Sequence, residues 1–498
     1  MKEGLLINLG IVRYGYAADL QLKLAELRLQ NEIPDSILLL EHLPVVTIGN
    51  QGSKTNLNLS EKELWSRGIE VQQSDRGGDL TLHTPGQLVI YPILDLNQHG
   101  RDLHLYVRKL EEVGIRVAAE FGITAQRRQG YPGVWVDDFK LGSVGMSSRR
   151  WITRHGMALN VNNRLEDFSV INPCGFDSGV MTSLSVLKQE ELLMSDVAAV
   201  MAKHFAEVFL LDLQPSGLPA SGLGQPPWLK SKVPHGDIVD NTQAVFEELN
   251  LNSVCREADC PNCVDCFSRG VATFLIMGAN CTRNCRFCGV QHDAPLPLDP
   301  AEPQQVALAA KRLKLKHVVI TSVTRDDLPD GGAQHFVATI QALRSGLPDT
   351  TIEVLVPDFM GNSQNLETVL DARPDILAHN LETVPRLCPE IRSDANYRRS
   401  LDLIQQAAKN QSGIMIKSGI MVGLGETVAE VGQLMADLVG AGCQSFTLGQ
   451  YLSPESEAFP VTEYVTPPMF ESYQAMAETA GFDSVMCGPL VRSSYFSA

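Results

Sequence analysis

A segment rich in proline, glycine and serine interrupts the chain between residues 215 and 234. It contains Pro215-Ser216-Gly217-Leu218-Pro219 and Gln225-Pro226-Pro227, which cannot sustain a helix or a central strand. The chain has 498 residues, whereas a single hydrophobic core stops growing at roughly 250–300 residues. We therefore predict two domains, residues 1–214 and residues 235–498, joined by a linker over residues 215–234.

The composition is that of a globular protein and argues against nucleic acid and membranes as partners. Hydrophobic residues make up 44% of the chain and charged residues 20%, so both domains can bury a core. The net charge of −17 lacks the clustered Lys and Arg that a phosphate backbone requires, so we expect no nucleic-acid partner. No apolar run is long enough for a membrane span, and residues 1–10 do not have a signal-peptide pattern. We expect a cytoplasmic protein with no membrane partner.

The N-terminal domain has the pattern of a mixed α/β fold. Apolar runs at 37–40 and 45–48 accompany a helical, Leu-rich stretch at 18–31. Residues 133–136 and 140–145, separated by the turn Asp137-Asp138-Phe139, predict a β-hairpin. Lys140 would begin its second strand.

In the C-terminal domain, apolar strands alternate with helical segments. The expected strands lie at residues 318–320, 352–356, 376–378, 414–416 and 445–448. This order predicts a parallel sheet or partial barrel of β/α units, with the active site at the C-terminal ends of the strands.

Seven of the eleven cysteines fall between Cys255 and Cys288. Such a cluster, at short and unequal spacings in a large chain, favours metal binding in a reducing compartment over disulfides. Cys281, Cys285 and Cys288 form a C-x3-C-x2-C loop, which offers three thiolates to one 4Fe-4S cluster and leaves the fourth iron open. Structural zinc, which normally takes four ligands in two separated pairs, remains an alternative on spacing alone.

This loop, with Phe287 before Cys288, resembles the signature of the radical S-adenosylmethionine (SAM) superfamily. The resemblance implies a partial TIM-like barrel whose open iron holds the amino and carboxyl groups of SAM. It also implies that an electron from the cluster yields methionine and a 5′-deoxyadenosyl radical, and that an electron donor such as flavodoxin or ferredoxin is a partner.

Four further motifs narrow the resemblance to lipoyl synthase over roughly residues 228–498. They are Cys266-Phe267-Ser268-Arg269-Gly270, residues 322–332 (SVTRDDLPDGG), residues 379–384 (HNLETV) and Arg492-Ser493-Ser494-Tyr495. The resemblance implies a second, auxiliary 4Fe-4S cluster that is the source of sulfur. Its implied ligands are Cys255, Cys260, Cys266 and Ser494.

Cys263 departs from the family's pattern. Cys260, Cys263 and Cys266 also form a C-x2-C-x2-C run that would compete for iron. We expect Cys263 to be a spectator, and we expect the isolated Cys388, Cys443 and Cys487 to be small buried hydrophobic residues.

In the N-terminal domain, Cys174 lies in Ile171-Asn172-Pro173-Cys174-Gly175, where Pro and Gly predict a tight loop able to expose a thiol. Lys140 on the predicted hairpin would stabilise its thiolate. A single cysteine is more often an inert buried residue, and a lysine a solvated charge, so this pair alone does not identify a nucleophile.

Three segments give the N-terminal domain, over roughly residues 5–215, a resemblance to lipoyl(octanoyl) transferase, which is related to the biotin/lipoate ligase fold. They are residues 76–87 (RGGDLTLHTPGQ), 140–145 (KLGSVG) and 155–160 (HGMALN). The resemblance implies that Cys174 is the nucleophile and Lys140 its activator. The implied acyl pocket is lined by Arg76, Gly77, Gly78, Asp79, Leu80, Thr81, Leu82, His83, Ser143, Val144, Gly145, Gly156, Met157 and Ala158. Asp79 and Leu82 stand where the family usually has a polar residue and an aromatic one.

The implied reaction transfers an octanoyl group from octanoyl-acyl carrier protein to Cys174, and then to a lysine of a lipoyl domain. The implied acceptors are the lipoyl domains of 2-oxoacid dehydrogenases and the glycine cleavage H protein. In the lipoyl synthase family, sulfur then enters at carbons 6 and 8 of the octanoyl chain, so the first product is the second substrate.

Two features, a histidine in the implied pocket and a group of three arginines, each have two interpretations that the sequence leaves open. His83 is a candidate proton shuttle, or else a structural hydrogen-bonding residue. Arg149, Arg150 and Arg154 form a candidate docking face for an acidic carrier protein, or else an ordinary solvated face.

Two alternatives to the whole assignment remain at this point. The N-terminal domain could be an ATP-dependent lipoate ligase, which needs no Cys174, beside a different radical SAM sulfur-insertion domain. The second alternative is a zinc-binding scaffold whose cysteines only join loops.

Overall fold

In a computed structural model of the protein, the described residues are 1–172, 178–220, 223–230, 237–254, 262–392, 394–410, 413–454 and 458–494. The chain divides into two units, residues 1–218 and 219–498, and each is described by itself. The division falls inside the Pro- and Gly-rich segment 215–234. None of the described helices is long and apolar enough to cross a membrane.

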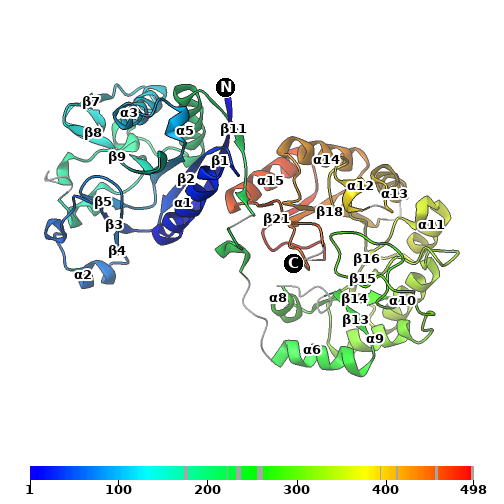
Figure 1. Ribbon diagram of the computed structural model, residues 1–498. Coiled ribbons are helices and arrows are strands. Elements are labelled where there is room, and N and C mark those ends of the chain that lie inside the picture. The colour runs from blue at the N-terminus through cyan, green and yellow to red at the C-terminus, as the bar shows by residue number, and fades with distance from the viewer. Residues whose placement is uncertain are drawn as a thin grey trace. The chain divides into compact units, whose positions relative to one another are not determined.

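The N-terminal unit is built on a mixed eight-stranded sheet with the order β11-β1-β2-β6-β10-β9-β8-β7 (Figure 1). Strand β1 pairs in parallel with β2 and β11, and the other pairs are antiparallel. A smaller sheet has the order β4-β3-β5. The strands are β1 (Lys2–Val12), β2 (Asp35–His42), β3 (Val45–Ile48), β4 (Glu70–Gln73), β5 (Leu80–His83), β6 (Gln87–Ile93), β7 (Gln126–Arg128), β8 (Tyr131–Val136), β9 (Phe139–Arg149), β10 (Ile152–Asn160) and β11 (Leu211–Pro215).

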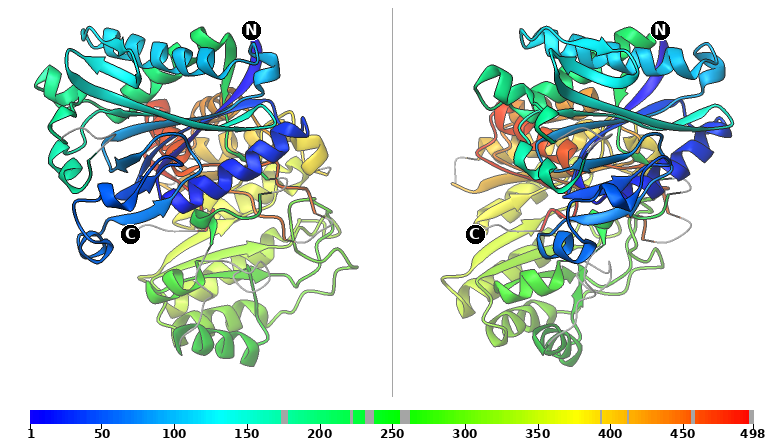
Figure 2. Two further views of the ribbon diagram at one scale, coloured as in Figure 1. Left: turned by 60° about the vertical axis from the view of Figure 1, so that its left-hand side comes forward. Right: turned by 90° about the vertical axis from the view of Figure 1, so that its left-hand side faces the viewer.

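Helices cover both faces of the larger sheet, which is why its central strands are buried at nearly every position. Helix α1 contacts β6 and β10, whereas α3 and α5 pack on each other and share a core with β2 and β6 (Figure 2). The helices are α1 (Tyr14–Leu29), α2 (Glu61–Ser66), α3 (Leu103–Glu120), α4 (Leu184–Lys188) and α5 (Met194–Phe209), with 3-10 turns η1 (Lys54–Asn56), η2 (Leu96–Gln98), η3 (Leu165–Val170) and η5 (Ser178–Val180).

The predicted hairpin is present as β8 and β9, but its turn is shorter than the sequence suggested. Strand β9 begins at Phe139, so the turn has two residues, Asp137 and Asp138. Asp137 takes a φ of 51°, the left-handed conformation that two-residue hairpin turns require. Trp135 pairs with Lys140 across the hairpin, after a register shift at Val134.

The C-terminal unit contains an eight-stranded sheet with the order β13-β14-β15-β16-β17-β18-β19-β21. All neighbours are parallel except β13 and β14. Its strands are β13 (Asn252–Ser253), β14 (Val271–Ile276), β15 (His317–Ser322), β16 (Thr351–Leu355), β17 (Ile376–Ala378), β18 (Met415–Val422), β19 (Ser445–Gln450) and β21 (Ser484–Gly488); β20 (Glu463–Tyr464) lies outside this sheet, and β12 (Leu218–Pro219) spans the boundary between the units.

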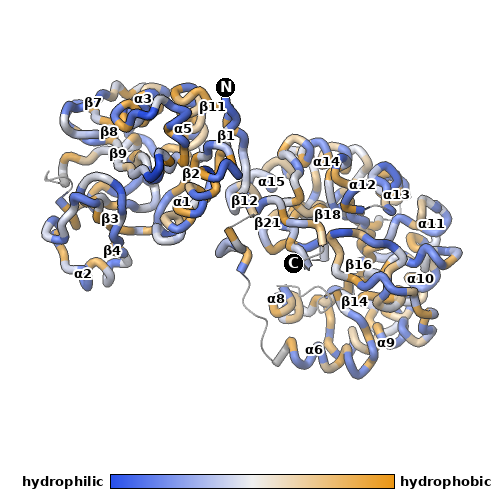
Figure 3. The backbone as a smooth tube through the Cα atoms, in the orientation of Figure 1, coloured by the Kyte–Doolittle hydropathy of each residue, from blue (hydrophilic) through white to orange (hydrophobic). Residues whose placement is uncertain are grey.

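Spatial order follows chain order in this sheet because helices return the chain from the end of one strand to the start of the next. The helices are α6 (Asp237–Glu248), α8 (Cys263–Ser268), α9 (Glu302–Arg312), α10 (Ala333–Gly346), α11 (Ser363–Asp371), α12 (Cys388–Ile391), α13 (Tyr397–Lys409), α14 (Val428–Gly440) and α15 (Pro467–Ala480), with η6 (Pro227–Leu229) and η7 (Phe359–Gly361). Apolar residues concentrate along the central strands (Figure 3). The predicted α/β class, with a mixed first domain and a parallel second one, is confirmed.

Candidate active sites

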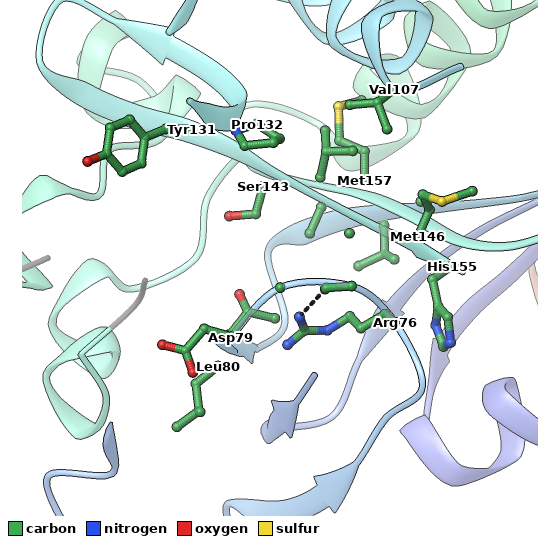
Figure 4. A pocket seen from close by; sticks show the side chains of 18 of the residues that line it. Arg76, Asp79, Leu80, Val107, Tyr131, Pro132, Ser143, Met146, His155 and Met157 are labelled. Atoms are coloured by element: carbon green, nitrogen blue, oxygen red, sulfur yellow. Dashed lines mark hydrogen bonds between the residues drawn. The ribbon is translucent and has the colours of Figure 1, made fainter. Parts of the chain in front are cut away.

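A cavity of about 590 Å³ lies in the N-terminal unit, where the Gly-rich segment before β5 faces β9 and β10 (Figure 4). Lys140 and thirteen of the fourteen predicted acyl-pocket residues line it. These thirteen are Arg76, Gly77, Gly78, Asp79, Leu80, Thr81, His83, Ser143, Val144, Gly145, Gly156, Met157 and Ala158. The three separate sequence segments are therefore brought to one concave site.

Leu82 is the exception, and its prediction as a pocket residue is corrected here. It is fully buried, pairs with Val46 across β3 and β5, and packs in the small apolar core with Phe168. A leucine at this position therefore stabilises the smaller sheet rather than contacting the contents of the cavity.

Arg154 also differs from its prediction as a residue of a solvated or docking face. It is 9% exposed and forms an ion pair with Asp75, which also accepts a 2.7 Å bond from His155. Arg154 is therefore not part of a solvated docking face, although Arg149 and Arg150 are exposed at the turn after β9. Strand β10 is buried along its length, and a charged residue there needs an internal partner.

Lys140 is 7% exposed and is held against the indole of Trp135, with Nζ 5.4 Å from the ring centroid. A cation over an aromatic face is stabilised in its charged form. Gly133 makes room for the neighbouring strand and for this side chain, because a Cβ at Gly133 would lie 2.5 Å from the Gly142 carbonyl oxygen and 2.9 Å from Cε of Lys140. Burial, the indole and the missing Cβ together fix the ammonium group beside the cavity.

Cys174 lies outside the described residues, but the chain on both sides of it is anchored at the cavity. Before it, the backbone N–H of Asn172 donates to the Asn56 carbonyl at 3.0 Å. After it, the backbone N–H of Thr182 donates to the Lys140 carbonyl at 3.0 Å. Cys174 is two residues from Asn172 in the sequence.

His83 is 5% exposed and its Nδ1 lies 2.6 Å from Oε1 of Gln87. Burial lowers the pKa of His83 well below its ordinary value, and the neighbouring His42 lowers it further. His83 is therefore neutral at physiological pH, so it can hydrogen-bond to a ligand but does not carry a positive charge there.

Several lining residues were not predicted from the sequence, including Tyr91, Val107, Tyr131, Met146 and His155. They come from five different elements, and no short motif joins them. His155 carried a usable signal, since it begins the segment 155–160, and Tyr131 and Met146 flank the strands predicted for the hairpin.

Gly133→Ala is expected to slow acyl transfer by about 10- to 100-fold, because displacing a catalytic group by an ångström costs about that much. Gly133 has a φ of 147°, so the variant also carries backbone strain of about 1–3 kcal/mol. Single-turnover kinetics and thermal unfolding separate the two effects.

Gly122→Ala is the matched control, because Gly122 also has a positive φ of 75° but a Cβ there meets nothing within 4 Å. Equal rates for the two variants at equal stability would show that room for Lys140 is not what Gly133 provides.

In the C-terminal unit, the loop with Cys281, Cys285 and Cys288 follows β14 at the C-terminal edge of the parallel sheet. The Sγ of Cys281 accepts the backbone N–H groups of Thr324 at 3.3 Å and Arg283 at 3.5 Å. Burial, with a smaller contribution from the neighbouring thiols, raises the pKa of Cys285 to about 12 and that of Cys288 to about 11. The thiols of this loop lie close enough together to oppose one another's ionisation. A bound iron cation would remove this cost, because the iron takes the place of the thiol protons.

A chain of ion pairs fixes this loop to the barrel. Arg283 donates two bonds to Asp326, at 2.7 and 2.9 Å, and one to Asp358 at 2.7 Å. Asp358 is fully buried and also accepts a 2.6 Å bond from Arg399 on α13. Burial alone would raise the pKa of Asp358, but the bonds and charge of Arg283 outweigh it and hold that pKa at about 2.

Asp358→Asn is expected to destabilise the C-terminal unit by about 2 to 4 kcal/mol, because it removes one partner of a buried ion pair. The pKa of Asp358 is lower in the folded state, so its contribution is complete above its ordinary value of 3.8 and is lost as the pH falls towards 2. The difference in the free energy of unfolding between the variant and wild type should therefore narrow below about pH 4. Urea unfolding followed by amide exchange of β15 and β16 measures it.

Asp371→Asn, at the exposed end of α11, is the matched control. It should leave the urea unfolding and the amide exchange of β15 and β16 unchanged. If the difference in the free energy of unfolding between Asp358→Asn and wild type stayed constant down to pH 2, the charge of Asp358 would not be the cause of its stabilising effect.

Polar groups with unmet hydrogen bonds gather after the strands that face this loop. Among the described residues, four buried atoms have no partner: Ser322 Oγ at the end of β15, Asn380 Oδ1 and Thr383 Oγ1 in the segment after β17, and Arg392 Nε directly after α12. Arg392 and Glu382 are also close enough to Cys285 to influence its pKa. Buried polar atoms of this kind are normally satisfied, so they fit a polar ligand bound beside the thiols.

Within the described ranges, no three His, Cys, Asp or Glu side chains are arranged around a single metal ion. The thiolates of one tetrahedral zinc ion would lie within about 4 Å of one another, given Zn–S distances near 2.3 Å. The ligands of a 4Fe-4S cluster bind separate iron atoms and lie farther apart. The loop spacing and the unmet polar atoms therefore fit an iron–sulfur cluster with a bound small molecule.

The predicted auxiliary ligands are only partly described. Cys255 and Cys260 lie outside the described residues, whereas Cys266, on α8, and Ser494 are both partly exposed. Nδ2 of Asn262, at the start of α8, donates to the Leu490 carbonyl at 2.6 Å, so the helix is tied to the segment that leads to Ser494. Cys263 is 6% exposed and lines a small apolar cavity with Phe246 and Phe267.

The N-terminal unit matches the family model "Lipoyl protein ligase A/B catalytic domain" over residues 13–206. It is also similar to a crystal structure of lipoate-protein ligase A bound with ATP, with 15% identity and a TM-score of 0.38, covering 43% of this chain and 88% of that one. Residues 275–438 match the model "Radical SAM superfamily".

The C-terminal half is similar to curated lipoyl synthases. The enzyme of Oleidesulfovibrio alaskensis is 53% identical over 270 residues, which are 54% of this chain and 92% of that protein. The enzyme of Caldanaerobacter subterraneus subsp. tengcongensis is 52% identical over 271 residues, covering 54% and 95%. The chain belongs to the lipoyl synthase family.

The matches of the two halves together confirm the predicted fusion. The N-terminal half matches a transferase- or ligase-type catalytic domain, and the C-terminal half matches a radical SAM enzyme of lipoate biosynthesis. These matches also confirm the predicted cofactors, S-adenosylmethionine and 4Fe-4S clusters. The specific acyl donor, the individual ligands and the catalytic pair stay predictions.

Proposed function

We propose that this chain catalyses two consecutive steps, octanoyl transfer to a lipoyl-domain lysine in the N-terminal unit and sulfur insertion into the bound octanoyl group in the C-terminal unit. The observation that carries the first step is the position of Lys140. It lies in the wall of the cavity, and its backbone is bonded to the segment that follows Cys174.

In the first step, the Cys174 thiolate attacks the thioester carbonyl of octanoyl-acyl carrier protein, and the octanoyl group becomes a thioester of the enzyme. The ammonium group of Lys140 stabilises the thiolate and lowers the pKa of the thiol. Apolar side chains along β9 and β10, including Val144 and Met157, contact the acyl chain. Transfer from thioester to amide runs downhill without ATP.

In the second step, Cys281, Cys285 and Cys288 would hold the cluster that binds S-adenosylmethionine, and Ser322, Asn380, Thr383 and Arg392, whose buried polar atoms have no partner, would be available to hydrogen-bond its polar groups. Cys255, Cys260, Cys266 and Ser494 would hold the auxiliary cluster. When bound, these groups supply radical chemistry at carbons 6 and 8 of the octanoyl chain and the two sulfur atoms. The barrel positions the chain and excludes water.

The partners follow from the two reactions. They are octanoyl-acyl carrier protein, the lipoyl domains of 2-oxoacid dehydrogenases and the glycine cleavage H protein, and an electron donor such as flavodoxin or ferredoxin. We propose that both reactions take place in the cytoplasm. Covalent linkage raises the effective concentration of one active site for the product of the other.

A trapped acyl-enzyme tests the first step. Protein incubated with octanoyl-acyl carrier protein and no ATP should gain one octanoyl group, which peptide mapping should locate on Cys174. Cys174→Ser is the control for the site of attachment. Octanoylation of a lipoyl domain that requires ATP and free octanoate would instead support the ligase alternative.

A further inference from the structure

One carboxylate in the transferase cavity has an unusual environment. Asp79 precedes β5 and lines the cavity, and its Oδ2 accepts a 2.7 Å bond from Nδ2 of Asn56. Its other oxygen, Oδ1, is buried and has no hydrogen-bond partner among the described residues. The carboxylate is thus held in one orientation with one oxygen left for a donor.

The cavity's own cations do not supply that donor. Arg76 donates to Thr47 and to the Gly77 carbonyl, and Lys140 lies over Trp135. In Figure 4 the Asp79 carboxylate points away from the Arg76 guanidinium.

An octanoyl chain has no N–H or O–H group, so it cannot satisfy this oxygen. A buried acceptor without a donor costs free energy, and a charged acceptor is best satisfied by a charged donor. The second substrate of the transferase is a lysine side chain, whose ammonium group has three donors. We propose that Asp79 is the binding site for the ε-ammonium group of the acceptor lysine, an assignment that rests on the proposed octanoyl transfer.

The position of Asp79 suits this role, because the residue that holds it also anchors the approach to Cys174. Asn56 donates to Asp79 with its side chain and accepts the backbone N–H of Asn172 with its carbonyl. Asn58 and Asn172 exchange side-chain amide bonds of 3.2 and 2.8 Å. A lysine bound at Asp79 is therefore separated by one residue, Asn56, from Asn172, which precedes Cys174 by two positions in the sequence.

The transfer step removes two protons from the ammonium group of the acceptor lysine. The ammonium group gives one proton to the Asp79 carboxylate and becomes a neutral amine. Its nitrogen attacks the acyl carbon, the C–N bond forms, and the C–S bond to Cys174 breaks. The second nitrogen proton passes to the leaving thiolate, and Asp79 later releases its proton to water. The products are the octanoyl amide, the Cys174 thiol and one proton.

The test uses full-length acyl-enzyme made from octanoyl-acyl carrier protein, with an apo lipoyl domain or dithiothreitol as acceptor in single-turnover assays. Asp79→Asn should slow transfer to the lipoyl domain by about 100-fold, the lower range for loss of a general base. Transfer to dithiothreitol, which has no ammonium group, should change by less than about threefold, since it makes no use of the Asp79 carboxylate. Asp79→Glu should recover part of the loss.

Asp212→Asn is the matched control, because Asp212 is exposed on β11 at the far edge of the sheet order. The assignment is overturned if Asp79→Asn transfers to the lipoyl domain at the wild-type rate, or if it loses transfer to both acceptors equally, which indicates a structural role. Wild-type protein that forms no acyl-enzyme would instead refute octanoyl transfer itself.

Discussion

Cys285→Ala is expected to abolish the conversion of octanoylated lipoyl domain to lipoylated domain, by a factor of roughly 10³ or more, because a first ligand is lost and the parts of such a site act as a unit. Cys285 is the central thiol of the loop and, like Cys281, lies two residues from Arg283, which anchors that loop to Asp326 and Asp358. Octanoyl transfer by the N-terminal unit should be unchanged. Mass spectrometry of the lipoyl domain measures both activities in one sample.

Cys443→Ala is the matched control for this variant. Cys443 is 5% exposed and its thiol contacts the Ser445 carbonyl at 3.3 Å, far in sequence from the iron-binding loops. It should keep wild-type iron and sulfide content, whereas Cys285→Ala should lose about half of each if two clusters are present. Wild-type lipoyl formation by Cys285→Ala would remove the basis for the radical SAM site.

Cys174→Ala is the second large effect, and it should reduce octanoyl transfer from octanoyl-acyl carrier protein by roughly 10³-fold or more, because the nucleophile is lost. Lys140→Met should cause a similar loss while the thiol remains, because the thiolate is no longer stabilised at neutral pH. Both variants should still insert sulfur into a domain that is octanoylated in advance. Acyl-enzyme formation followed over time distinguishes slow attack from slow transfer.

Lys188→Met, at the exposed end of α4, is the control for loss of a lysine and should transfer at the wild-type rate. Cys174→Ala that still octanoylates the lipoyl domain, and does so only with ATP, would favour the ligase alternative over the transferase.

The regular elements were predictable because their signals are local. The strands of the C-terminal unit read as continuous apolar runs, such as Val318-Val319-Ile320, since parallel strands are buried on both faces. The β8–β9 hairpin was predictable from two extended runs around Asp137-Asp138, although the register that sets Lys140 opposite Trp135 was not. Register depends on a bulge at Val134 that no local pattern marks.

The misassigned residues depended on packing between distant segments. Leu82 was read as a pocket residue from its place in a motif, but β5 pairs with β3, which comes from residues 45–48. Arg154 was read as a surface charge, but its partner Asp75 lies 79 residues away in sequence. The unpartnered oxygen of Asp79 was equally hidden, because its orientation is set by Asn56.

The most direct test of two consecutive activities in one chain is the mass of a lipoyl domain. Reconstituted, oxygen-free protein is incubated with apo domain, octanoyl-acyl carrier protein, S-adenosylmethionine and reductant, and the domain is weighed over time. We predict a gain of one octanoyl group, followed by its replacement with the mass of one lipoyl group. A domain that stays unmodified, or remains octanoylated when both clusters are intact, would contradict the proposal.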